Sequence, residues 1–284
     1  MKTYDIILIG TGQATGTILP VLLKKELSVA VIEADRVGGT CVNWGCTPTK
    51  TLVASARAAH VAGRGGDFGI NIDNYSIDFS KVMERVNGMR VPASEGFEEW
   101  LKEVTDFYRA AGSFVDNHTL RVGDDTIRGE KIIIHTGARA RKPDIEGIDS
   151  VQWLDNRRIL ALEAPPKHLL VVGGSYIGLE FAQAYRRFGS EVSVLEFGDR
   201  IVSREDPDVS AVALKILSDE GIQFHLNAET KKLEKKGADI ELSFSKNGSN
   251  ELLSGSHLLI AVGRVPNTDT LNLSAAGVET NKRG

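Results

Sequence analysis

The sequence predicts an α/β protein with two three-layer domains in tandem, each built around a parallel sheet. The chain has 284 residues, and one domain per roughly 150 residues suggests two domains. Short β-branched apolar runs alternate with helical stretches, as in βαβ units. The order strand, Gly-rich turn, helix, strand, acid occurs twice, with 33 − 10 = 23 positions from Gly10 to Glu33 and 196 − 173 = 23 positions from Gly173 to Glu196.

Composition narrows the function classes. The net charge of −4 gives no electrostatic reason to expect nucleic acid or a membrane as partner. No apolar run approaches the ~20 residues that span a bilayer, and the start lacks the features of a signal peptide, so we expect a cytoplasmic protein. The 2 cysteines suggest a redox role there, and they do not suffice for a four-coordinate zinc site, so we expect no metal site.

Strands and helices are expected to alternate along both halves. In the first half we expect a strand over 4–9, a helix to about Glu26, a strand over 28–33, a loop holding both cysteines, helices over 48–60 and 78–110 with a break near Pro92, and short strands over 113–135. A linker over 164–166 precedes a strand over 168–172, a helix over 176–188, a strand over 191–195, a helix over 207–220, a strand over 222–226 and a meander within 233–262.

The first Gly-rich turn runs from Gly10 through Gly12 to Gly16. Glycines there permit a tight turn and let a pyrophosphate approach the N-terminus of the next helix. Thr15 replaces the usual third glycine, so we expect slightly looser packing of helix on strand. An ordinary strand–helix turn is the alternative, and the acid at Glu33, placed to bind a ribose, argues against it.

The second turn runs from Gly173 to Gly178, with Ser175 where the second glycine is usual. Glu196 ends the next strand, where an acid binds the adenosine ribose and disfavours a 2′-phosphate. The sequence therefore predicts NADH in preference to NADPH, with Arg200 and Arg204 as the residues that would favour NADPH.

Residues 38–50, GGTCVNWGCTPTK, are the most specific segment of the chain. Gly45 lets the chain fold back between Cys41 and Cys46, so the spacing permits a disulfide without enforcing it. Cys46 lies at the start of the predicted helix, where the helix dipole favours a thiolate. Lys50 is on the same helical face. Two unbonded core thiols are the alternative.

With this segment between its two turns, the chain resembles the pyridine nucleotide–disulfide oxidoreductases, the family of dihydrolipoamide dehydrogenase, glutathione reductase and mercuric reductase. The resemblance covers essentially the whole chain, and GTCVNWGCTPTK is most similar to the mercuric-reductase-like branch, although Thr47 stands where an aliphatic residue is usual. The implied fold is two Rossmann-like domains, tandem and interleaved. The expected ranges are an FAD-binding domain with a redox-active disulfide over 1–150, an NAD(P)-binding domain over 151–270, and the start of the return to the FAD domain over 271–284.

The resemblance implies an FAD-dependent NAD(P)H:disulfide oxidoreductase acting on a small-molecule disulfide or dithiol. Hydride from NADH would pass to FAD, then to the Cys41–Cys46 disulfide, with Cys46 beside the flavin and Cys41 exchanging with substrate. Lys50 would lie near the flavin and pair with Glu180, and Tyr176 would cover the flavin face.

The resemblance also implies the cofactor contacts. The residues implied for FAD are Gly10, Gly12, Gln13, Ala14, Glu33, Gly39, Thr40, Lys50, Gly112, Thr136, Gly137 and Ala138. Those implied for NAD, with NADP as second choice, are Gly173, Gly174, Ser175, Tyr176, Ile177, Gly178 and Glu196. Residues 261–267, which include Gly263, resemble the family's return segment.

Family members carry a further FAD-contacting motif and an interface domain with a catalytic histidine, and neither is found before Gly284. We therefore expect this chain alone to bind FAD weakly and to be inactive, and we expect a homodimer only for a full-length protein. Two alternative functions are metal-ion reduction, as in mercuric reductase, and a non-catalytic flavin-binding redox module. Lys50 and Glu180 beside an intact cysteine motif argue against the module.

Overall fold

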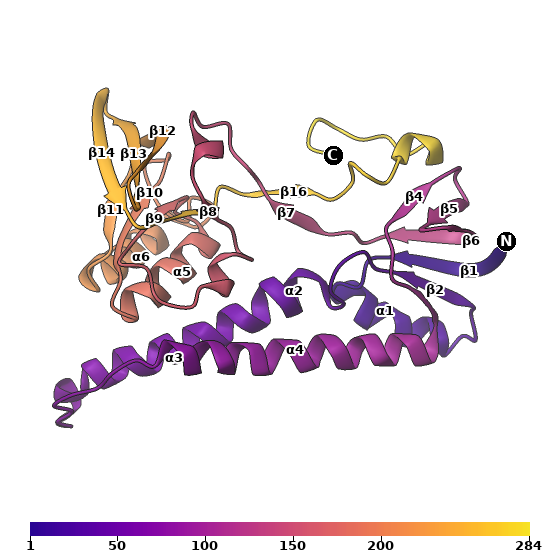
Figure 1. Ribbon diagram of the computed structural model, residues 1–284, viewed down its shortest axis with the longest axis horizontal. Helices are drawn as coiled ribbons and strands as arrows, with labels where there is room; N and C mark the ends of the chain where they lie inside the picture. The colour runs from indigo at the N-terminus through magenta and orange to yellow at the C-terminus, as the bar shows by residue number, and fades with distance from the viewer. The chain divides into compact units, whose positions relative to one another are not determined.

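The computed structural model describes residues 1–284, which form two compact units (Figure 1). Unit 1 comprises residues 1–48, 87–139 and 264–284, and unit 2 comprises residues 49–86 and 140–263. The units are interleaved more deeply than the expected ranges 1–150 and 151–270, because residues 49–86 contribute buried side chains to the core of unit 2. Which cofactor each unit binds remains a prediction.

Unit 1 contains a six-stranded sheet in the order β3-β2-β1-β6-β5-β4. The pairs β3–β2, β2–β1 and β1–β6 are parallel, and β6–β5 and β5–β4 are antiparallel. The strands are β1 (Lys2–Ile9), β2 (Val29–Ile32), β3 (Asp106–Tyr108), β4 (Gly112–Phe114), β5 (Thr119–Val122) and β6 (Asp125–Ile134). A separate two-stranded sheet joins β7 (Ala138–Ala140) to β16 (Arg264–Pro266).

The central strand β1 is apolar because both of its faces are covered. Ile7 lies in a core cluster with residues of β4 and β5, whereas Ile6 and Leu8 lie in another with α1 (Gln13–Leu23) and α4 (Phe79–Val104). Fully burying one such side chain is worth about 1.5–3 kcal/mol. This two-sided burial explains why the apolar run in the sequence identified the strand.

Unit 2 contains a parallel five-stranded sheet in the order β11-β10-β9-β15-β8. Its strands are β8 (Trp153–Leu154), β9 (His168–Val172), β10 (Glu191–Leu195), β11 (Gln223–His225) and β15 (His257–Ile260). An antiparallel meander of β12 (Ala228–Lys236), β13 (Asp239–Lys246) and β14 (Ser249–Gly255) covers one face. The helices α3 (Cys46–Gly63, from Thr49 on), α5 (Tyr176–Arg187) and α6 (Pro207–Asp219) contribute to the core on the other.

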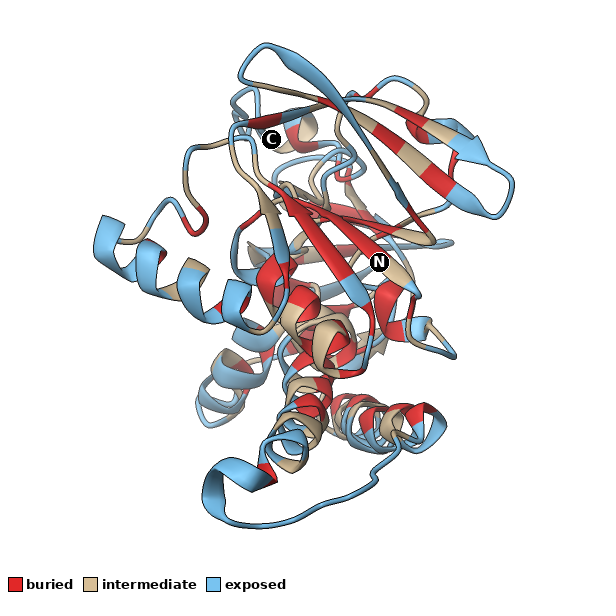
Figure 2. Ribbon diagram, turned by 90° about the vertical axis from the view of Figure 1, so that its left-hand side faces the viewer, coloured by how far each residue is buried: buried red, intermediate tan, exposed pale blue.

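The two faces of this second sheet also bury alternate residues. Leu169 and Val171 of β9 lie in the core cluster that includes α5, and Leu170 and Val172 lie in the cluster that includes the meander. Figure 2 shows central strands of the sheet almost wholly buried, whereas strands of the meander alternate between buried and solvent-facing residues. An α/β fold of two Rossmann-like sheets is therefore confirmed.

Three expectations about single elements were wrong. The expected loop of residues 38–46 contains a short helix, α2 (Gly39–Trp44), and α3 already begins at Cys46. α4 runs through Pro92 without a break, because buried side chains such as Val86 and Leu101 hold it on both sides of the proline. The expected helix 78–110 ends at Val104, and its last residues form β3, which pairs with β2.

Short 3₁₀ segments fill several connections, at Gly65–Phe68, Ile148–Ser150, Ile159–Ala161 and Leu273–Ala276.

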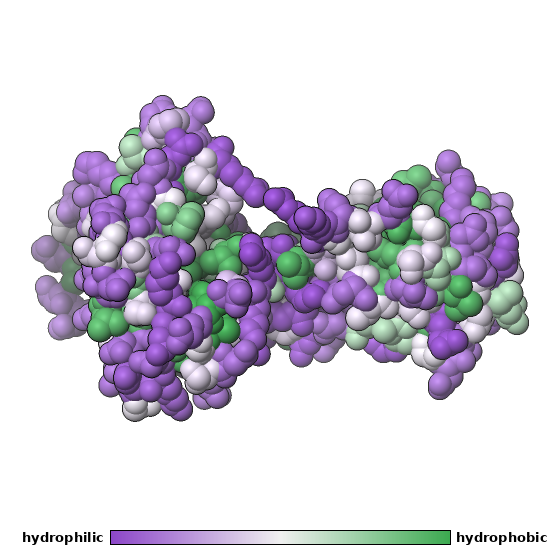
Figure 3. Space-filling view, turned by 90° about the horizontal axis from the view of Figure 1, so that it is seen from above, coloured by the Kyte–Doolittle hydropathy of each residue, from purple (hydrophilic) through white to green (hydrophobic).

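The face drawn in Figure 3 is mostly hydrophilic, with apolar surface in separate patches. None of the helices combines the length and the apolar character that crossing a membrane requires.

His225 of unit 2 is half-buried, and its ring lacks polar partners. Both ring nitrogens of His225, at the end of β11, are buried and make no hydrogen bond, and the ring packs edge-on against Phe244 with centroids 5.2 Å apart. Burial lowers the pKa of His225, and the positive charge of Lys246 lowers it further. Burial also lowers the pKa of His257.

We therefore expect the free energy of unfolding to fall as the pH drops from 7.5 to 5.5. A histidine whose folded pKa is depressed binds its proton more readily in the unfolded chain, so acid favours unfolding through the unfolded histidine range. Urea titrations at the two pH values measure this, and His225→Leu should flatten the dependence. Equal pH dependence in the variant and the original chain would show that His225 is not its cause.

Candidate functional site

The first Gly-rich turn connects β1 to α1 at the carboxyl edge of the unit 1 sheet. Gly10 has φ +108° and donates its N–H to the carbonyl of Ile32 at 2.8 Å. A Cβ at Gly10 would lie 2.3 Å from the carbonyl oxygen of His135, so only glycine fits. Gly12 caps α1, and Gln13 and Ala14 are exposed in its first turn, where N–H groups attract an anion.

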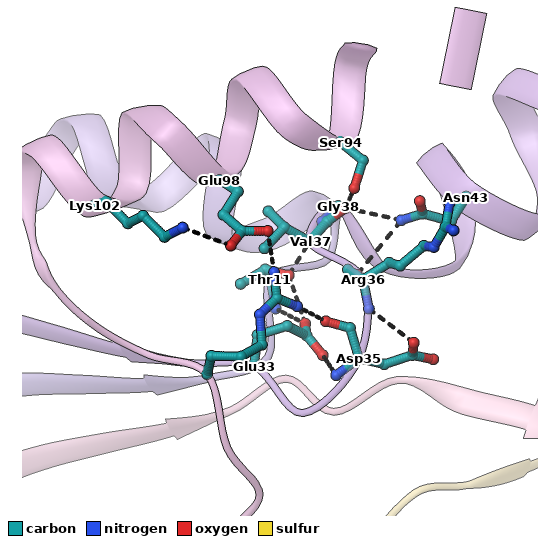
Figure 4. A network of polar contacts seen from close by, with 11 residues as sticks. Thr11, Glu33, Asp35, Arg36, Val37, Gly38, Asn43, Ser94, Glu98 and Lys102 are labelled. Atoms are coloured by element: carbon teal, nitrogen blue, oxygen red, sulfur yellow. Dashed lines mark hydrogen bonds and ion pairs between the residues drawn. The ribbon is translucent and has the colours of Figure 1, made fainter. Parts of the chain in front are cut away.

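Glu33 binds this turn directly (Figure 4). Its Oε2 accepts the Thr11 N–H at 3.0 Å and the Thr11 hydroxyl at 2.5 Å, and its Oε1 accepts the N–H of Asp35 at 2.8 Å. The Thr11 hydroxyl oxygen in turn accepts the N–H of Gly38 at 3.1 Å. The acid predicted to bind a ribose therefore also fixes the turn and the loop that follows it.

The second turn in unit 2 has the same geometry. Gly173 has φ +112°, and a Cβ there would lie 2.5 Å from the carbonyl oxygen of Ala261. Glu196 accepts the N–H of Gly174 at 2.6 Å and the N–H of Gly198 at 2.9 Å. The two repeats seen in the sequence therefore form the same contacts. In each, a carboxylate at the end of the second strand accepts a backbone N–H of the Gly-rich turn.

The two turns differ at their third motif position. A Cβ at Gly178 would lie 2.1 Å from the carbonyl oxygen of Gly173, so α5 packs tightly against its turn. Thr15 occupies the equivalent place in unit 1, where its buried hydroxyl donates to the carbonyl of Gly10 at 2.7 Å. A hydrogen bond therefore replaces the close approach that glycine allows.

His135 is a residue of the first turn that the sequence did not reveal. Its Nε2 accepts the N–H of Ala14 at 3.2 Å, at the start of α1. The residue at the matching strand end in unit 2 is Ala261, since it meets Gly173 as His135 meets Gly10. No motif marks His135, because its side chain reaches the turn only once β6 pairs beside β1.

The cysteines lie at the junction of α2 and α3, close in sequence to the first turn. A Cβ at Gly39, the first residue of α2, would lie 3.0 Å from the Cα of Gly12, so the start of α2 touches the turn. Cys41 is half-buried and Cys46 is exposed, and both are free thiols. Burial raises the pKa of the Cys41 thiol, and a hydrogen bond with Cys46 raises it further.

Asn43 holds the segment between the cysteines. It is fully buried, and its Nδ2 donates to the carbonyl of Val37 at 2.8 Å and to that of Gly39 at 3.1 Å. Ser94 of α4 donates to the same Val37 carbonyl at 2.6 Å (Figure 4). These bonds let a Gly-rich segment form a helix, which explains why its composition suggested a loop.

Two side chains that were expected to pair do so in unit 2. Lys50 of α3 forms an ion pair with Glu180 of α5, as the resemblance implied. Tyr176, the first residue of α5, is 46% exposed and donates its hydroxyl to Glu205, which raises the pKa of that hydroxyl. No motif in the sequence marks Glu205 as its partner.

The return segment forms hydrogen bonds with Thr136, Gly137 and Ala138, the expected FAD contacts that follow β6. Asn267 donates its N–H to the Gly137 carbonyl at 3.0 Å and its Nδ2 to the Thr136 carbonyl at 2.9 Å. Arg264 donates to the carbonyl of Ala138 and to the hydroxyl of Thr40. Elsewhere, Gly112 is buried against Ile32 at the start of β4, and Gly263 accepts the Arg141 N–H at 2.9 Å.

Several characterised proteins are similar to this chain. A mercuric reductase of Lysinibacillus sphaericus is 32% identical over 284 residues, which are 98% of this chain and 52% of that protein. A dihydrolipoyl dehydrogenase of Bacillus subtilis (strain 168) is 33% identical over 99% of this chain and 61% of its own length. The probable pyridine nucleotide-disulfide oxidoreductase RclA of Escherichia coli (strain K12) is 35% identical over 100% of this chain and 62% of its own length.

A solved structure described as the Cu(II) complex of the HOCl-induced flavoprotein disulfide reductase RclA from Escherichia coli superposes with a TM-score of 0.89. It is 34% identical and covers 100% of this chain and 62% of its own chain. The chain thus spans 52% to 62% of the length of these relatives. The family model described as pyridine nucleotide-disulphide oxidoreductase matches residues 4–284, which include both turns and the cysteine pair. The chain belongs to the pyridine nucleotide–disulphide oxidoreductase family.

Proposed function

We propose that this chain supplies the dinucleotide-binding units and the redox-active cysteine pair of an FAD-dependent NADH:disulfide oxidoreductase. The observation that carries the proposal is the contact between the first turn and the start of α2, where Gly39 touches Gly12. That contact puts the helix that carries Cys41 beside a dinucleotide-binding turn. A dithiol beside such a turn is the arrangement that electron exchange between a bound dinucleotide and a disulfide needs.

Unit 1 suits FAD. Gly10 has no room for a side chain, and the N–H groups at the start of α1 are those that bind a pyrophosphate in this fold. Glu33 accepts bonds from Thr11 and Asp35, and a carboxylate has about four lone-pair sites, so it can also accept a ribose hydroxyl. When bound, FAD would convert the hydride of a nicotinamide into electrons that a disulfide can accept.

Unit 2 suits NADH by the same reasoning. Glu196 would accept the ribose hydroxyls of the nicotinamide dinucleotide and would repel a 2′-phosphate. The half-buried carboxylate is held by Gly174 and Gly198, so it cannot simply turn away from such a phosphate. Tyr176 is exposed at the start of α5, where a side chain can cover a bound ring.

The cysteines would perform the exchange with substrate. A thiolate of the reduced pair attacks a substrate disulfide, a mixed disulfide forms, and one substrate thiolate leaves. The second cysteine then displaces the other substrate thiolate and closes the Cys41–Cys46 disulfide. In unit 2, Lys50 would remain fixed by its ion pair with Glu180.

The proposal is tested by adding FAD and NADH separately to the purified chain and following flavin and nicotinamide fluorescence. The chain is then reduced with dithiothreitol, freed of it and mixed with a small disulfide, so that thiol–disulfide exchange is followed in a single turnover that does not depend on NADH. Cys41→Ser is the control, because it should retain dinucleotide binding and lose disulfide reduction. A chain that binds neither dinucleotide would contradict the proposal.

Metal-ion reduction is the second candidate. Several similar proteins are named mercuric reductases, and one similar structure is described as a Cu(II) complex. NADH oxidation by a full-length form, with Hg²⁺ or Cu²⁺ in place of the disulfide, separates the two candidates. Turnover with the metal ion and none with disulfides would favour metal-ion reduction.

We expect Cys41 and Cys46 to form a disulfide in the oxidised protein. The Cys46 thiol is close enough to raise the pKa of the Cys41 thiol, and only Gly45 and three other residues separate them. Thiol titration of the unfolded chain should find no free thiol before reduction and 2 after reduction. Cys46→Ser should show a single thiol in both states, and two free thiols in the oxidised, unfolded chain would refute the pairing.

We also expect Glu196→Gln to weaken the preference for NADH over NADPH by about 10- to 100-fold, since a hydrogen bond to a charged group is worth about 1.5–3 kcal/mol. Titrating each nicotinamide into the purified chain measures the ratio of dissociation constants. Glu33→Gln is the matched control in unit 1 and should leave the ratio unchanged. A clear NADPH preference in the original chain would contradict the assignment of Glu196 to NADH selection. Arg200 and Arg204 would then be the residues to substitute.

A further inference from the structure

One of the four residues between the two cysteines is a tryptophan in contact with two arginines. Trp44 ends α2, three residues after Cys41 and two before Cys46. The guanidinium carbon of Arg90, from α4, lies 4.9 Å from the centre of the Trp44 ring, and that of Arg36 lies 5.5 Å from it. All of these residues belong to unit 1, so their arrangement is a property of one compact body.

Neither guanidinium forms an ion pair with a carboxylate. Arg90 uses Nε to donate to the side-chain oxygen of Asn87 at 2.8 Å and Nη1 to donate to the Asn43 carbonyl at 3.1 Å. The neighbouring Asp35 directs Oδ1 at the backbone N–H of Arg36, at 2.8 Å. Arg36 is exposed, and Figure 4 shows its side chain extending toward Asn43. Both guanidiniums thus contact the ring, and their charged groups remain available to a further partner.

This arrangement costs free energy in the chain by itself. Burial lowers the pKa of Arg90, and the nearby charge of Arg36 lowers it further, which means that the two cations repel each other. Cation–π contacts with one ring offset part of this repulsion. An anion placed between the guanidiniums would offset the rest, because arginine pairs with carboxylates and phosphates through its planar set of donors.

We propose that Arg36, Trp44 and Arg90 form a subsite for the anionic group of the disulfide substrate. The proposal rests on the dithiol function proposed above and narrows its substrates to disulfides that carry a carboxylate or another anion. Trp44 places the subsite in the segment that joins the cysteines, three residues from Cys41 and two from Cys46 along the chain. The exchange itself is unchanged: the attacking thiolate forms a bond to one substrate sulfur, the S–S bond breaks, and the other sulfur leaves as a thiolate.

The test uses the purified chain, reduced with dithiothreitol and freed of it, without FAD. Stopped-flow rates are measured at low ionic strength with a dianionic disulfide, 5,5′-dithiobis(2-nitrobenzoate), and a dicationic one, cystamine. The ratio of the two rates is the readout, because a change in thiol reactivity alone affects both reagents and largely cancels. Coulomb's law in water gives about a twofold change in rate per pair of unit charges about 10 Å apart.

Arg36→Gln and Arg90→Gln should therefore each lower the anion-to-cation ratio by about three- to tenfold, and added salt should shrink the effect. Arg36→Lys keeps the charge and should preserve most of the ratio. The matched control is Arg121→Gln, which removes one exposed charge from β5 and should leave the ratio close to that of the original chain.

The outcomes separate the two proposals. If both reagents react and neither Arg36→Gln nor Arg90→Gln changes the ratio, the anion subsite is overturned while the dithiol function stands. If Arg121→Gln lowers the ratio as much as Arg36→Gln, net charge is the cause and the subsite is again overturned. If the reduced chain reacts with neither reagent, the dithiol function fails. Arg36 is exposed, so its variant tests the subsite even if Arg90→Gln unfolds the chain.

Discussion

The architecture of both units depends on a carboxylate that binds the backbone of a Gly-rich turn. Glu33 and Glu196 each accept an N–H of the turn and a second N–H further along the loop. Hydrogen bonds to an ionised acceptor are stronger than neutral ones, and each is worth about 1.5–3 kcal/mol. They join the turn to the end of the neighbouring strand, and so they fix where α1 and α5 begin. The spacing of 23 positions between turn and acid, the same in both repeats, is therefore explained by this bond without any bound ligand.

In unit 1 the same bond extends to the cysteines. The Thr11 hydroxyl donates to Glu33 and accepts from Gly38, which directly precedes α2. Asn43 and Ser94 then hold the carbonyl of Val37, so the loop before α2 is bound from the turn, from α2 itself and from α4. The segment that carries Cys41 is therefore positioned by the dinucleotide turn. A change at Glu33 would disturb both the proposed cofactor contact and the position of the dithiol, so the two proposed roles are hard to separate by mutation there.

Most of the fold could be predicted from the sequence because buried parallel strands leave a strong apolar signal and the turns leave a glycine signal. β1, β2, β9 and β10 were found in this way. α2 was missed because the glycines at its two ends favour a loop, whereas the bonds from Asn43 and from Ser94 of α4 that stabilise the segment cannot be read from the sequence. β3 was missed because its pairing with β2 is a tertiary contact. The pairing of Lys50 with Glu180 could be anticipated only from the family resemblance, since 130 residues separate them.

The two repeats are similar scaffolds with different polar groups at the turn. Gly10 and Gly173 meet equivalent strand-end residues, yet His135 accepts the N–H of Ala14 and the methyl group of Ala261 has no such capacity. Thr15 and Gly178 differ in the same sense, since the first makes a hydrogen bond where the second makes close contact. The N-terminus of α1 is therefore bound by more side-chain groups than that of α5, and the pyrophosphate proposed for the first turn would share its N–H donors with His135. The spacing of the glycines determines the backbone shape of each turn. The residue after the neighbouring strand, His135 or Ala261, determines whether a further polar group contacts that turn.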